Sequence, residues 1–60
     1  MNLHELSYFL CLECKVVLKN GNEYFGQIDY KRKDGQDYLV IDNRDYFKLE
    51  EVQNVFNLKS

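Results

Sequence analysis

The stretch "VVLKNGNEYFG", Val16–Gly26, decides the fold, because it joins two β-strands through a glycine turn. Apolar and polar residues alternate before Asn20-Gly21 and again after it, as in strands with one buried face. Asn-Gly is a strong hairpin signal, since both residues tolerate a positive φ. Gly26 falls inside the second strand, where glycine usually marks a bend or a close backbone approach. The stretch predicts a hairpin whose second strand is bent.

The same two glycines, with four residues between them, have the spacing that opens a phosphate-binding loop. Such a loop needs Lys and then Ser or Thr after its second glycine, followed by a helix. Here Gln27 and Ile28 follow Gly26, and the strand pattern continues. The glycines therefore indicate a turn and a bent strand, and no nucleotide site.

The size of the chain limits what it can hold. Its 60 residues predict a single domain, 1–60, that buries only about 60% of its unfolded surface. A hydrophobic share of 45%, with five tyrosines and four phenylalanines, argues against disorder. The net charge of −2 argues against a protein that mainly coats phosphates. There is little room for both a core and a catalytic cleft.

The N-terminal segment 2–10 predicts a short helix, with Asn2 and Glu5 in a capping-box pattern. Its apolar run is interrupted by His4, Glu5 and Ser7 and has no basic segment before it, so it predicts neither a signal peptide nor a membrane span. A cytoplasmic protein with no membrane partner and with reduced cysteines is the expectation.

Outward from the opening stretch, short apolar runs alternate with turn residues at intervals of about 8–12 residues. Strands are expected over 14–18, 23–30, 37–42, 46–49 and 54–58, with charged turns at 31–36 and 43–45 and one helical turn at 50–52. The predicted fold class is mainly β: a short N-terminal helix, 2–10, followed by a five-stranded antiparallel SH3/Sm-like barrel, 13–58. The predicted core consists of Leu18, Tyr24, Ile28, Leu39, Ile41, Val52 and Val55, closed at one end by Leu6 and Phe9.

The segments "VVLKNGNEYFGQI", "YLVID" and "LEEVQNV" resemble the Sm-like fold over roughly residues 3–58. The matching positions are Leu18, Gly21, Tyr24, Gly26, Ile28, Leu39 and Ile41. The outline also looks like the Rho-binding inhibitors, the Rof family, which are Sm-like barrels that bind a protein. The resemblance implies a small barrel that binds RNA or protein.

The motifs with which Sm-like proteins bind RNA are incomplete in this chain. The family reads a base with an Asp–aromatic–Asn set, and "KRKDGQDYLV" lacks the asparagine just after the aromatic residue. The family's Ile-Arg-Gly motif aligns with Phe47, Lys48 and Leu49, where Lys48 keeps the charge but Leu49 replaces the glycine. The resemblance therefore supports the fold more strongly than it supports RNA binding.

No set of side chains with catalytic or metal-binding spacing is present. Cys11, Cys14 and His4 supply three soft ligands, and zinc usually takes four. Cys14 is expected in the core, Cys11 at the end of the helix and His4 on the surface. The acidic residues lack calcium-loop spacing; they are Asp42, Asp45, Glu50 and Glu51. We therefore expect no enzyme activity and no cofactor.

The candidate partner-binding residues combine charge with aromatic area: Lys31, Arg32, Lys33, Tyr46, Phe47 and Lys48. The basic run alone is also typical of a solvated turn. With these residues the sequence predicts a non-catalytic regulator or inhibitor that docks on a larger protein through a barrel face. The alternative is an Sm-like RNA-binding protein that forms an oligomeric ring. Open edge strands would also allow homo-oligomers.

Overall fold

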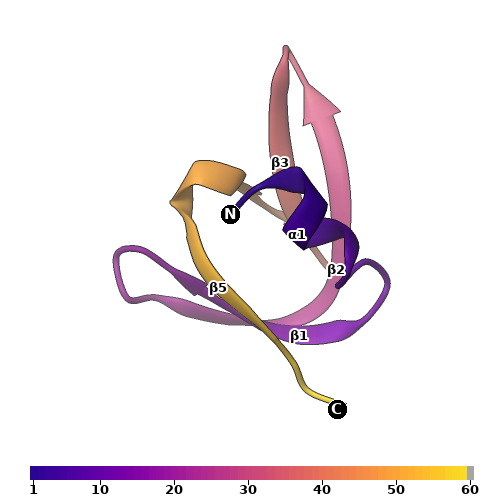
Figure 1. The fold of residues 1–60 in the computed structure, drawn as a ribbon, viewed down its shortest axis with the longest axis vertical. Helices are drawn as coiled ribbons and strands as arrows, with labels where there is room; N and C mark the ends of the chain where they lie inside the picture. The colour runs from indigo at the N-terminus through magenta and orange to yellow at the C-terminus, as the bar shows by residue number, and fades with distance from the viewer. Residues whose placement is uncertain (60) are drawn as a thin grey trace.

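A computed structural model describes residues 1–59 (Figure 1). Their elements, in chain order, are α1 (Leu3–Ser7), β1 (Glu13–Leu18), β2 (Glu23–Lys33), β3 (Gln36–Ile41), β4 (Asp45–Lys48), the 3-10 turn η1 (Leu49–Glu51) and β5 (Val52–Asn57). All strand pairs are antiparallel. The predicted class, mainly β with one short N-terminal helix, is confirmed.

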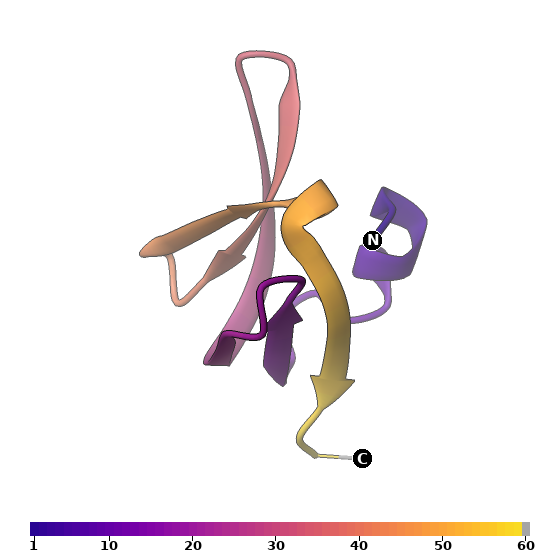
Figure 2. The same cartoon turned by 90° about the vertical axis from the view of Figure 1, so that its left-hand side faces the viewer.

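The five strands form one sheet in the order β4-β3-β2-β1-β5. β4 and β5 are its two edges, and they do not pair with each other, so the sheet is curved but not closed into a barrel (Figure 2). β4 has only four residues, and η1 carries the chain directly from β4 into β5. The predicted five antiparallel strands are therefore present, as a curved open sheet with two free edges.

The N-terminal helix is shorter than the predicted segment 2–10. The predicted capping box is present: the Asn2 side chain accepts a hydrogen bond from the Glu5 N–H at 2.8 Å, and the Glu5 side chain accepts one from the Asn2 N–H. The helix ends after Ser7, and the chain continues in turns up to Cys11, whose φ is +67°. That left-handed residue turns the chain into β1 and brings the Cys11 N–H to the Ile28 carbonyl at 2.8 Å.

The first hairpin uses a different turn from the one that Asn20-Gly21 suggests. Only Gly21 has a positive φ, +94°, and its N–H bonds to the Leu18 carbonyl at 2.9 Å. Asn20 instead accepts a hydrogen bond from the Asn22 N–H through its side-chain oxygen, at 3.0 Å. This is a three-residue loop with glycine in the left-handed position.

The turn between β2 and β3 is shorter than the predicted turn 31–36. This difference places the basic run, residues 31–33, in a strand. Asp34 and Gly35 both have a positive φ, +51° and +77°, as a two-residue type I′ turn requires. The ladder therefore extends to the pair Lys33–Gln36, and residues 31–33 belong to β2 and not to a turn.

The bend of β2 lies just after Gly26. Residues 23–27 of β2 pair with β1, whereas residues 28–33 pair with β3. At this point the Gln27 N–H donates to the Asp42 side chain at 2.9 Å, and the Ile28 N–H donates to the Leu12 carbonyl at 3.0 Å. β2 thus belongs to both halves of the curved sheet, as its course in Figure 1 shows.

The core lies inside the curve of the sheet, beneath α1. The predicted core residues Leu18, Ile28, Leu39, Ile41, Val52, Val55 and Leu6 are all buried, and Tyr24 and Phe9 pack against them partly buried. Cys14 is fully buried with them, as expected. Val16 and Leu49 complete the cluster.

Candidate functional site

The register of β2, β3 and β4 decides which candidate residues share a face. Leu39, in the core, lies opposite Tyr30 on one side and Phe47 on the other, and both pack against the core. Because side chains alternate along a strand, the next row, Lys31–Tyr38–Lys48, points away from the core. The row Asp29–Val40–Tyr46 points outward for the same reason.

We call this outward surface the lysine–tyrosine face; it consists of Lys31, Lys33, Tyr38, Tyr46 and Lys48. Tyr38 and Tyr46 meet edge to face, with ring centroids 6.1 Å apart. Val40 lies opposite Tyr46 and is 3% exposed, although it is not part of the main cluster of buried side chains. The two rings and the buried valine thus form a second small apolar cluster on the outside of the sheet.

The lysines of this face are free of ion pairs within residues 1–59. Lys31, Val40 and Tyr46 line the same open depression, of about 370 Å³, with Asp29 at its side. An unpaired cation beside a half-exposed ring gives both charge for long-range attraction and apolar area for contact.

Arg32 also lines this depression, but its guanidinium is bound within the β2–β3 hairpin, so we do not count it in the lysine–tyrosine face. Its Nη1 lies 3.1 Å from Asp37 Oδ1, and the same carboxylate oxygen accepts a hydrogen bond from the Tyr30 hydroxyl at 2.6 Å. That hydrogen bond is the main reason why the pKa of Tyr30 is raised above its usual value. Arg32 therefore stabilises the end of the β2–β3 hairpin.

Phe47 does not belong to it either. Its ring packs against Tyr24 with centroids 4.7 Å apart, on the core side of the sheet. The structure thus brings together Lys31, Lys33, Tyr46 and Lys48 from the predicted set, and adds Tyr38.

The sequence reasoning missed a second outward face, on β2, β1 and β5. Lys15 lies opposite Phe25 on β2 and Phe56 on β5, and its ammonium is 5.1 Å from the centre of the Phe56 ring. Phe25 is 59% exposed and Phe56 is 47% exposed. The alternation that predicts Tyr24 and Ile28 in the core also predicts Phe25 on the outer face.

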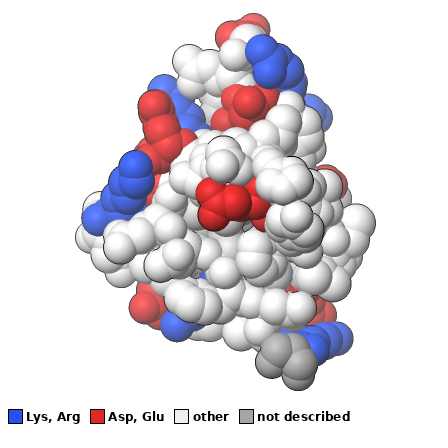
Figure 3. Space-filling view, in the orientation of Figure 1, with Lys and Arg blue, Asp and Glu red and all other residues white. Residues whose placement is uncertain are grey.

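The side of the molecule that carries α1 has few charges. Figure 3 shows a broad uncharged area with an acidic group near its middle and most other charges toward its rim. Four apolar side chains of α1 and the segment after it are partly exposed: Leu3, Tyr8, Leu10 and Leu12. His4 contacts Tyr8 in this segment, with its Nε2 3.1 Å from the tyrosine hydroxyl oxygen.

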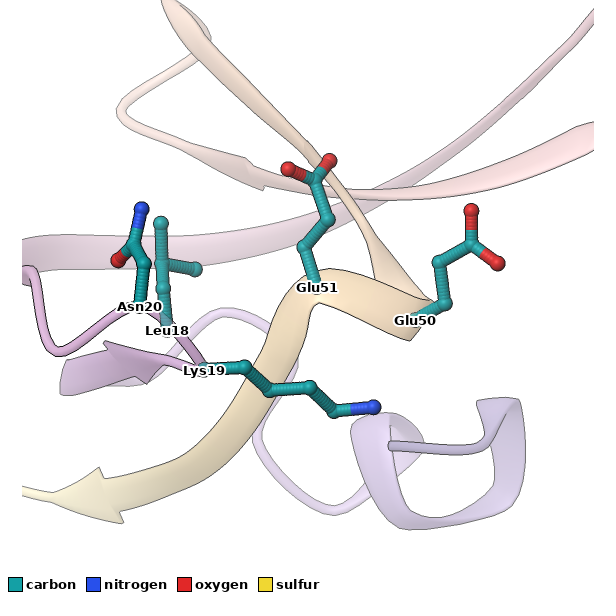
Figure 4. Close-up of a pocket in the computed structure, with 5 residues that line it drawn as sticks. All are labelled: Leu18, Lys19, Asn20, Glu50 and Glu51. Atoms are coloured by element: carbon teal, nitrogen blue, oxygen red, sulfur yellow. The ribbon is translucent and has the colours of Figure 1, made fainter.

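A shallow pocket lies between the first hairpin loop and η1 (Figure 4). Leu18, Lys19 and Asn20 line one side of it, and Glu50 and Glu51 line the other. The Lys19 N–H donates to the Glu51 carbonyl at 2.9 Å, and the Glu51 carboxylate accepts from the Lys48 N–H at 3.2 Å. The first bond holds the hairpin loop against η1, and the second caps η1; neither brings a nucleophile near a base.

The described part of the chain contains no group of three or more His, Cys, Asp or Glu side chains arranged to hold a metal ion. Within the same residues, no helix has the length and the apolar character needed to cross a membrane.

Comparison with known proteins gives no relative for this chain: no protein-family model, no curated protein and no solved structure matches it. The open antiparallel sheet is compatible with a small β-barrel-like fold. The likeness to the Sm-like fold therefore rests on the pattern of glycine and apolar positions.

Proposed function

We propose that this protein is a non-catalytic regulator or inhibitor that docks on a larger protein through the lysine–tyrosine face. The observation that carries the proposal is the outward cluster of Tyr38, Tyr46 and the buried Val40, next to lysines that are not ion-paired within residues 1–59. Aromatic anchors with a well-packed base are typical of the residues that dominate binding energies.

The charges around this cluster favour a partner with an acidic surface. Lys31 and Lys48 lie in one row on both sides of Tyr38, and Lys33 lies farther along β2. In a chain with a net charge of −2, these lysines concentrate positive charge on one face. Such a concentration speeds association with an oppositely charged surface and sets the orientation of the encounter.

Affinity capture with matched variants tests the proposal. The immobilised protein should retain a partner protein from a nuclease-treated lysate of the source cells, and Tyr46→Ala should lose it. Phe25→Ala, which removes an exposed ring from the other half of the sheet, is the matched control and should keep it.

The rate of association tests the role of the charges. Lys31→Glu should slow association about tenfold, whereas Lys19→Glu, in the first hairpin loop, should leave the rate nearly unchanged. Retention that nuclease abolishes, or that Tyr46→Ala leaves intact, would contradict the proposal.

The second candidate is an Sm-like RNA-binding protein. The row Lys31–Tyr38–Lys48 favours it, because an aromatic ring between two cations can stack a base while the lysines contact phosphates. In a salt titration with a single-stranded oligonucleotide, removal of each lysine should then lower the salt slope by about one unit.

The Sm-like and Rof-like resemblances correspond to these two candidates, one binding RNA and the other protein. Both edges of the sheet, β4 and β5, are unpaired within the described residues, which would allow pairing between subunits. The native mass distinguishes the candidates: a ring of several subunits favours the RNA-binding form, and a smaller species favours the regulator.

A further inference from the structure

The outward face on the other half of the sheet has a pattern of charge that is complementary to itself. We call it the phenylalanine face; it consists of Lys15, Val17, Glu23, Phe25 and Phe56. Lys15 lies opposite Phe25, and Val17 lies opposite Glu23. The side chains of β1 that alternate with these, Cys14, Val16 and Leu18, are buried in the core. The face thus offers exposed aromatic area together with one cation and one carboxylate.

Neither Lys15 nor Glu23 forms an ion pair with another of the residues 1–59. The ion pairs there are Arg32–Asp37, Arg44–Asp45 and Lys59–Glu13, so Lys15 and Glu23 take part in none of them. Lys15 is half-buried and leans over the Phe56 ring, 5.1 Å from its centre. Its ammonium is therefore held beside the exposed Phe56 ring, where a carboxylate from outside would be partly shielded from water.

We propose that a second copy of this chain packs on the phenylalanine face. On this face Lys15 and Glu23 stand at the ends of one diagonal, and Val17 and Phe25 stand at the ends of the other. A two-fold axis can lie in the plane of the interface and run along the Val17–Phe25 diagonal. Rotation about this axis stacks Phe25 on Phe25 of the second copy. The same axis places each Lys15 against the Glu23 of the other copy, so that two ion pairs form at once.

Charge complementarity favours a second copy over a partner of one sign. A uniformly acidic surface would pair with Lys15 but would repel Glu23, and a basic surface would do the reverse. The second copy satisfies both charges and buries the exposed rings. The molecule exposes 4130 Å², and a standard interface covers about 800 Å² per partner. The phenylalanine face spans only three strands, so the dimer should be weak and should exchange rapidly.

This dimer is independent of the proposed function, because it uses the opposite half of the sheet and is measured on the pure protein. Sedimentation velocity from about 10 μM to about 1 mM should show a concentration-dependent change from monomer to dimer. Phe25→Ser should weaken the dimer at least about tenfold, whereas Tyr46→Ala should leave it unchanged. Circular dichroism of each variant reports whether it is folded.

A charge swap provides the sharper test, since Glu23 is exposed and its replacement does not disturb the core. Lys15→Glu and Glu23→Lys should each weaken the dimer about threefold or more, because each breaks two symmetric ion pairs. The double variant Lys15→Glu/Glu23→Lys should restore the wild-type association. A wild-type protein that stays monomeric at about 1 mM, or a double variant no better than the single variants, would overturn the proposal.

Discussion

A Cβ atom on Gly26 would lie 2.5 Å from Cγ2 of Ile41 and 2.6 Å from Oδ2 of Asp42. Both neighbours are fixed: Ile41 is 1% exposed, and the Asp42 carboxylate accepts the Gln27 N–H. The start of the β3–β4 turn therefore packs directly on the backbone of β2, and only glycine leaves room for this contact.

The first prediction compares the two glycines of the opening stretch. Gly26→Val should lower the free energy of unfolding by at least about 1–3 kcal/mol, because its side chain would displace Ile41 and Asp42. Gly21→Ala should cost only about 1 kcal/mol, since nothing lies within 4 Å of the added Cβ and the cost is the φ of +94°. Urea titration of both variants measures the difference. Equal losses would contradict the close packing at Gly26.

The second prediction separates Phe47 from its neighbour Tyr46. Phe47→Ala should destabilise the fold by about 2 kcal/mol, because the ring packs against Tyr24 and the core. Tyr46→Ala should cost less than about 1 kcal/mol, since Tyr46 is 45% exposed. Thermal or urea unfolding checks both values. A Phe47 variant as stable as wild type would place that ring outside the core.

The third prediction concerns high pH. The hydrogen bond to Asp37 favours the protonated Tyr30 phenol in the folded state, so its pKa there lies above its usual value of 10.0. The resulting stability is complete below the unfolded pKa and is lost as the pH rises through the raised folded pKa. Between pH about 8 and about 11, wild type should lose more stability than Tyr30→Phe, in which this phenol is absent. Identical losses in urea titrations would show that the hydrogen bond contributes nothing.

The fourth prediction uses the two thiols. Cys11 is exposed, whereas Cys14 is fully buried, and burial raises the pKa of the Cys14 thiol. The thiolate is the reactive form, so a thiol reagent should modify Cys11 rapidly and Cys14 only when the sheet opens. In Cys11→Ser, modification should therefore become slow and should accelerate with added urea. Fast modification of that variant in native buffer would contradict the packing of Cys14.

Much of the fold follows from local signals in the sequence. The alternation in β1 and β2, the glycine turns and the capping box of Asn2 and Glu5 each depend on neighbouring residues, and each predicts an element that the structure contains. Whether the sheet closes into a barrel cannot be predicted from such local signals. It depends on where β4 and β5 end in space after η1, which is set by the twist and curvature of the whole sheet.

The candidate site was predicted only in part, because its members depend on the length of β2. When Lys31, Arg32 and Lys33 are interpreted as a turn, all three side chains appear equivalent. Once the type I′ turn at Asp34-Gly35 extends the ladder to Lys33, alternation separates Arg32 from the two lysines. Phe47 could have been assigned to the core from its two-residue spacing to Leu49, which is buried.

Photo-crosslinking from position 46 tests the central claim most directly. A photoreactive phenylalanine analogue would replace Tyr46 in one variant and Phe25 in a matched control, and both would be irradiated in the source-cell lysate. Docking through the lysine–tyrosine face predicts a discrete adduct from position 46 that contains another protein, survives nuclease and is absent from position 25. An adduct that nuclease removes would contradict the claim. So would an adduct with a protein other than a second copy of this chain that forms from position 25 and not from position 46.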